Sequence, residues 1–120
     1  MYKINGKTIY SPTDLMVFMN SPFSSWMARL SVDHPERLKG IEKDRDEMMD
    51  LLANKGNEHE LLFLGEMKQQ FGPDNVAVIN PVRKTAEQDT KEAMEKGYQV
   101  IFQAYLKRDA FAGFADFLVR

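Results

Sequence analysis

The sequence contains no cysteine, which excludes disulfides, iron–sulfur clusters and zinc sites built on thiolates. It lacks an apolar run near the roughly 20 residues that a membrane span needs, and no signal-peptide pattern opens the chain. Its net charge of -2 and pI of about 5.7 exclude a basic field over the whole surface. We therefore expect a cytoplasmic protein without a membrane partner, which would have to meet nucleic acid through a local patch.

The length and the hydrophobic pattern predict one domain. A chain of 120 residues with 43% hydrophobic content is large enough for one core, and it shows no linker or repeat. Turn, capping and periodicity signals predict these elements: a hairpin around Asn5-Gly6, helices starting at Ser11-Pro12 and Ser21-Pro22, a charged amphipathic helix over 36–50, a strand over 76–79, a helix over 85–96, and strands over 98–106 and 113–119 joined as a hairpin. The fold class is α/β or α+β, with a helical N-terminal half that leads into a small mixed sheet.

A histidine and an acid border an apolar helical stripe. The 3.6-residue period places His59 and Glu60 beside the stripe that contains Phe63 and Met67, and Gly56 one turn earlier allows another element to approach closely. The sequence leaves open whether Gly56 ends the charged helix or lies inside one longer helix that reaches Phe71. Taken alone, a histidine at such an edge is more often a structural residue than a ligand.

Asp116 lies in an otherwise apolar strand between Phe114 and Leu118. Burying an unpaired carboxylate costs several kcal/mol, so we expect a cation, a metal or hydrogen-bond donors to compensate it. A hairpin centred between residues 109 and 110 would place Gln103 opposite Asp116 on the same face of the sheet. A structural Gln–Asp hydrogen bond and a functional site remain alternatives.

The order of these motifs resembles the nuclease domain of RecB-like proteins in the PD-(D/E)XK superfamily. The matching segments are Gly56-x-x-His59-Glu60, Thr90-x-x-Ala93-Met94-x-x-Gly97, Val100-Ile101-Phe102-Gln103-Ala104 and Gly113-x-Ala115-Asp116-Phe117-Leu118. Ser11-Pro12-Thr13-Asp14-Leu15 and Asn20-Ser21-Pro22 also fit, so the resemblance extends over nearly the whole chain. It implies a partial restriction-endonuclease-like fold and metal-dependent phosphodiester hydrolysis in DNA.

The resemblance also implies roles for individual residues. His59 and Asp116 would be ligands of Mg²⁺ or Mn²⁺, Glu60 a supporting acid, and Gln103 a residue that orients or lines the site. The predicted catalytic residues are Asp116, Glu60 and Gln103. Asp116 would thus be both a catalytic residue and a metal ligand. The metal would polarise the phosphate and activate a water molecule. No iron–sulfur cluster is expected, because Ser21 stands where some relatives have a cysteine.

The acid-x-lysine signature of the following strand would lie beyond Arg120. The resemblance therefore implies the N-terminal part of a nuclease domain, inactive alone. We expect the unpaired edge of the last strand to recruit a second chain and to give a homodimer or higher oligomer. The alternatives are a non-catalytic DNA-binding module and a protein-interaction module that kept the fold. For DNA contact the candidate phosphate-facing residues are Arg83, Lys84, Lys107 and Arg108, which are otherwise ordinary solvated charges.

Overall fold

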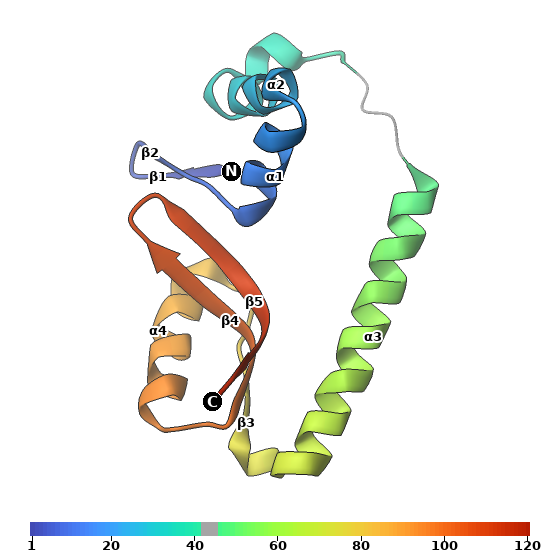
Figure 1. Cartoon of the computed structure of the whole chain (residues 1–120). Coiled ribbons are helices and arrows are strands. Elements are labelled where there is room, and N and C mark those ends of the chain that lie inside the picture. Colours follow the sequence, from blue (N-terminus) through green and yellow to red (C-terminus); the bar gives the residue numbers. More distant parts are fainter. Residues whose placement is uncertain (42–45) are drawn as a thin grey trace. The chain divides into compact units, whose positions relative to one another are not determined.

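The computed structural model describes residues 1–41 and 46–120, and the chain divides into two compact units (Figure 1). The N-terminal unit consists of the described residues within 1–43 together with 107–113, and the C-terminal unit consists of the described residues within 44–106 together with 114–120. The single domain expected from the sequence stays a prediction. None of the helices in the described part of the chain is long and apolar enough to cross a membrane.

The fold is α+β, as the sequence predicts. Its strands are β1 (Tyr2–Ile4), β2 (Lys7–Ile9), β3 (Val76–Val78), β4 (Val100–Arg108) and β5 (Phe111–Val119). Its helices are α1 (Pro12–Asn20), α2 (Pro22–Asp33), α3 (Glu47–Phe71) and α4 (Arg83–Glu95), with short 3-10 turns η1 (Pro35–Leu38) and η2 (Pro73–Asn75). The helices lead into a small mixed sheet in the order β3-β4-β5. The predicted likeness to the restriction-endonuclease fold stays a prediction.

Local signals determine the elements of the N-terminal unit. The predicted hairpin is confirmed: β1 pairs with β2 in antiparallel register around Asn5 and Gly6, which both have positive φ, as this turn requires. The two predicted helix starts are also confirmed. Ser11 and Ser21 each accept a hydrogen bond from a main-chain N–H in the first turn, and a proline follows each of them.

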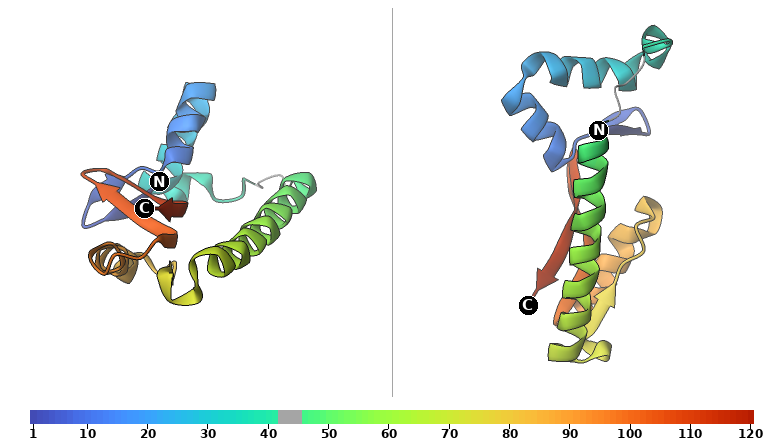
Figure 2. Two further views of the ribbon diagram at one scale, coloured as in Figure 1. Left: turned by 60° about the horizontal axis from the view of Figure 1, so that its bottom comes forward. Right: turned by 90° about the vertical axis from the view of Figure 1, so that its right-hand side faces the viewer.

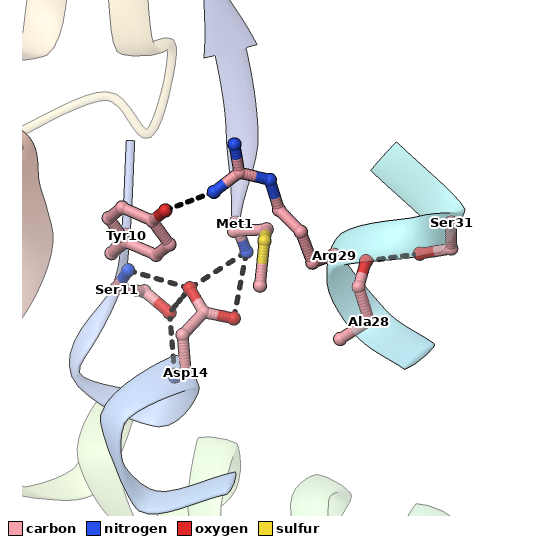
Figure 3. A network of polar contacts seen from close by, with 7 residues as sticks. All are labelled: Met1, Tyr10, Ser11, Asp14, Ala28, Arg29 and Ser31. Carbon is pink, nitrogen blue, oxygen red and sulfur yellow. Dashed lines mark hydrogen bonds and ion pairs between the residues drawn. The ribbon is translucent and has the colours of Figure 1, made fainter. Parts of the chain in front are cut away.

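Asp14 is the centre of a polar network in this unit (Figure 3). The Met1 ammonium group donates to its Oδ1 at 2.9 Å, and the main-chain N–H and the hydroxyl of Ser11 both donate to its Oδ2 at 2.7 Å. Burial opposes ionisation of Asp14, but these donors outweigh it and hold the pKa of the carboxyl group below its ordinary value of 3.8. The carboxylate therefore joins the start of the chain to the first turn of α1.

This network predicts acid sensitivity in the N-terminal unit. Because the pKa of Asp14 is lower in the folded chain, its ionisation stabilises the fold above about pH 4, and this stabilisation is lost as the pH falls through the folded-state pKa. We expect the protection factors of the α1 amides, which compare their exchange with that of an unfolded chain at the same pH, to fall below pH 4, and Asp14→Asn to remove that part of the pH dependence. Hydrogen exchange followed by NMR between pH 6 and pH 2 measures it. Identical pH profiles for the parent and the variant would contradict the assignment.

The predicted charged helix over 36–50 is wrong in its first part. Residues 35–38 form only a 3-10 turn, and Gly40 follows with a φ of 84°, a left-handed conformation that ends helical structure. The next helix, α3, begins at Glu47, where the side chain of Asp46 accepts hydrogen bonds from the N–H groups of Met48 and Met49. Residues 42–45 of the predicted helix lie outside the described residues.

Helix α3 continues without a break to Phe71, so Gly56 lies inside one long helix. The predicted close approach at Gly56 is absent: the residue is exposed, and a Cβ atom placed there would meet no described atom within 4 Å. The side of α3 that packs on the sheet instead begins one turn later. Its partly or fully buried positions are Glu60, Phe63, Leu64, Met67, Lys68 and Phe71, which follow the helical period.

The three-stranded sheet forms the core of the C-terminal unit, and α3 and α4 lie on opposite sides of it (Figures 1 and 2). Strand β3 runs parallel to β4, with Val76 opposite Val100. Helix α4 joins the two strands, as a parallel pair requires. Leu64 of α3 packs with Val76, Val100 and Phe102 in the hydrophobic core. This packing fixes the middle of α3 against β4.

Strands β4 and β5 form the predicted hairpin, with a two-residue turn at Asp109 and Ala110. Contacts along its length agree with the expected register. The ring centroids of Tyr105 and Phe114 lie 4.9 Å apart and those of Phe102 and Phe117 lie 5.1 Å apart. At the open end, the Arg120 N–H donates to the carbonyl oxygen of Gln99 at 2.9 Å. This register makes Gln103 and Asp116 cross-strand neighbours.

Candidate functional site

Gln103 has an unusual backbone conformation in the middle of β4. Its φ is +57°, in the left-handed region that residues other than glycine, asparagine and aspartate seldom adopt. Alternation along a regular strand would point its side chain away from α3, because its neighbour Phe102 packs in the core beneath that helix. Instead its Nε2 donates a hydrogen bond to Oε2 of Glu60 on α3, at 3.2 Å. The distorted backbone thus accompanies a side chain directed to the helix.

Glu60 occupies the first position of the buried stripe of α3, where an apolar residue would be the ordinary choice. The carboxylate is partly buried, and Gln103 supplies a neutral donor to it. A neutral amide orients a carboxylate without cancelling its charge. The pair therefore holds a carboxyl group at a defined place between α3 and β4.

Aromatic packing supports this pair from the side of β5. The rings of Phe63 and Phe117 meet edge to face with centroids 4.7 Å apart, and Phe117 also contacts Phe102. Phe63 lies one turn after Glu60, and Phe102 precedes Gln103. The three rings therefore hold α3 against β4 and β5 at the level of the Glu60–Gln103 hydrogen bond.

His59 and Asp116 do not have the surroundings that the sequence predicted. Both are exposed, so neither carries the desolvation cost that the apolar neighbours of Asp116 suggested. For His59 the reason is geometric: the buried stripe is centred near Leu64, and His59 lies on the flank of the helix turned away from it. For Asp116, β5 is an edge strand of a small sheet, and alternation places its side chain on the face opposite to that of Phe117. The expected burial of both residues is therefore wrong.

Among the described residues, no three histidine, aspartate or glutamate side chains gather closely enough to hold a metal ion. The donor types of His59, Glu60 and Asp116 suit Mg²⁺ or Mn²⁺, but the arrangement does not bring a sufficient set together. These residues alone therefore do not fit a metal centre, and their roles as metal ligands and catalytic residues stay predictions.

The sequence identified Glu60 and Gln103 from a resemblance, and the structure brings these two side chains together. It did not indicate the positive φ of Gln103 or the three-ring packing beside it. Glutamine carries no local preference for that conformation, so no sequence signal could have revealed it. Comparison of the chain with protein-family models, curated proteins and solved structures gives no match.

Proposed function

We propose that the chain is the N-terminal part of a metal-dependent DNA nuclease of the RecB-like kind, and that it does not cleave DNA alone. The observation that supports this most is the hydrogen bond between Glu60 and Gln103, two residues separated by 43 positions. Both residues belong to the motifs that carry the resemblance. A partly buried carboxylate bound by a side-chain amide, from a strand residue with a left-handed backbone, is more typical of a functional site than of a core.

His59 and Asp116 are both exposed and open to a ligand, on different faces of the C-terminal unit. In the described part of the chain, neither side chain has a hydrogen bond or an ion pair, so neither is committed to a structural role. Together with Glu60 they supply imidazole and carboxylate donors in one unit of the chain. A third carboxylate close to them would have to come from residues outside this set, which is why we expect the chain alone to be inactive.

A second candidate function is a protein-interaction module, and the exposed apolar surface favours it. Large apolar side chains face solvent along α3, namely Met48, Met49, Leu51, Leu52, Leu61 and Leu62. Strand β5 is also at the edge of its sheet, where a homodimer or a higher oligomer could form by strand pairing. This candidate requires neither a metal nor DNA.

One set of measurements separates the two candidates. For the nuclease part we expect no DNA cleavage above background with Mg²⁺ or Mn²⁺, together with Mn²⁺-dependent broadening of the NMR signals of Asp116 and its neighbours in β5. Asp116→Asn should abolish this broadening, whereas Asp74→Asn, on the exposed turn η2, should leave it unchanged.

Cleavage that depends on His59 would show that the chain is complete as a nuclease. Absence of broadening at Asp116 would reject Asp116 as a metal ligand. If light scattering then gave the mass of a dimer, the interaction module would be the better description.

A further inference from the structure

An aromatic ring flanked by cations protrudes at the tip of the β4–β5 hairpin. The two-residue turn makes Arg108 and Phe111 direct cross-strand neighbours on one face. The side chain of Phe111 is 60% exposed, and Lys107 and Arg108 are exposed as well. The hairpin tip thus presents an aromatic ring and two cations to solvent together.

Tyr10 continues this surface within the N-terminal unit. Its ring centroid lies 6.0 Å from that of Phe111. Its main chain makes two hydrogen bonds to the hairpin tip: the Tyr10 N–H donates to the Ala110 carbonyl oxygen, and the Tyr10 carbonyl oxygen accepts from the Ala112 N–H. Its hydroxyl accepts a hydrogen bond from Arg29, whose guanidinium carbon lies 6.0 Å from the ring centroid (Figure 3). Arg108, Phe111, Tyr10 and Arg29 thus form a row, which we call the aromatic–arginine row.

Among the described residues, no acidic partner neutralises the cations at the hairpin tip. Asp33 pairs with Lys3 and Arg29, but within the described residues Lys107 and Arg108 form no ion pair. The acid at the tip itself is Asp109, in the turn, with a φ of 54°. Uncommitted cations beside an exposed ring are the combination that binds single-stranded nucleic acid, because bases stack on the ring and phosphates meet the cations.

We propose that the aromatic–arginine row binds single-stranded DNA, with a base stacked on Phe111 and phosphates at Arg108 and Lys107. The proposal rests on the proposed function for the choice of DNA, but it does not involve His59, Glu60 or Asp116. Unpaired bases are required, because in a duplex the faces of the bases are stacked on one another and are closed to Phe111. The surface would therefore position a single strand independently of any metal.

Fluorescence anisotropy with a labelled oligothymidine in EDTA tests the row without the metal site. We expect the whole chain to bind, and Phe111→Ala to weaken binding by about tenfold, the typical loss of one stacking contact. Arg108→Ala should weaken binding and reduce the slope of log affinity against log salt by about 0.7, the value for one phosphate contact on a single strand. Asp109→Asn, which keeps a residue that tolerates the left-handed turn, should strengthen binding.

Matched controls are available in the same unit. Phe23 is 69% exposed on α2, and Arg37 is exposed on η1. Phe23→Ala and Arg37→Ala therefore remove an exposed phenyl ring and an exposed guanidinium group outside the aromatic–arginine row. Equal effects of Phe23→Ala and Phe111→Ala, equal affinity for duplex DNA, or no binding in EDTA would each overturn the proposal. Circular dichroism of each variant verifies that the fold is intact. If the row does not bind DNA but Mn²⁺ broadens the signals of Asp116, the proposed nuclease function still stands.

Discussion

Replacing Thr90 by valine is expected to lower the free energy of unfolding by about 1–3 kcal/mol, the cost of leaving a buried donor without its acceptor. Thr90 is 1% exposed on the side of α4 that faces the sheet, between the buried residues Ala86 and Ala93. Its Oγ1 accepts a hydrogen bond at 2.9 Å from the main-chain N–H of Tyr105. Strand β3 pairs with β4 only as far as Phe102, so the helix supplies a polar partner to the part of β4 beyond β3. Valine fills the same space without an acceptor.

Urea unfolding followed by circular dichroism measures this loss, and Thr90→Ser is the matched control. Serine keeps the hydroxyl and loses one methyl group, which costs about 1 kcal/mol. Amide exchange separates the two causes: the N–H of Tyr105 should exchange faster in Thr90→Val and remain protected in Thr90→Ser. A valine variant as stable as the parent, with Tyr105 still protected, would show that the hydrogen bond contributes nothing.

Replacing Gly113 by alanine is expected to destabilise the chain by about 1–3 kcal/mol, the usual cost of overpacking. A Cβ atom at this position would lie 2.9 Å from Cδ and 3.2 Å from Cγ of Pro12. The proline ring is rigid and begins α1, so relief requires the backbone to move. The loss of stability is due to the steric clash alone, because the backbone of Gly113 is not in the left-handed region.

Gly56→Ala provides the opposite case. Gly56 lies on the exposed surface of α3, and an added methyl group would meet no described atom within 4 Å there. Alanine in a helix interior is more favourable than glycine by roughly 0.5–1 kcal/mol, so this variant should be more stable than the parent. Thermal unfolding of both variants tests the pair. A stable Gly113→Ala would mean that hairpin and helix are not packed against each other at Pro12.

Where local chemistry determines the backbone, the sequence predicts the structure well. Ser11 and Ser21 begin helices because their side chains satisfy the free N–H groups of a first turn, and Asn5-Gly6 forms the hairpin turn because both residues tolerate positive φ. The hairpin of β4 and β5 follows the alternation and length of its two strands. Glu60 and Gln103 were identified from motif order, and their pairing is a contact that the structure adds.

Tertiary packing accounts for what the sequence could not predict. The buried side of α3 begins at Glu60 instead of Gly56, because β4 and β5 contact only the second half of that helix, and this shift leaves His59 in solvent. Asp116 has apolar neighbours in sequence but an exposed side chain, since it lies on an edge strand and its side chain points away from α3. The left-handed backbone of Gln103 accompanies its hydrogen bond to Glu60 in α3, and glutamine has no intrinsic preference that would predict it.

The hairpin of β4 and β5 is divided between the two units: its tip, residues 107–113, belongs with the N-terminal unit, and the remainder of both strands belongs with the C-terminal unit. During synthesis, α1 and α2 are therefore made well before the strand segment that bonds to Tyr10. Contacts between residues so far apart in the chain close slowly, because the intervening loop must first be ordered. The N-terminal unit should thus be the last part of the chain to complete its fold.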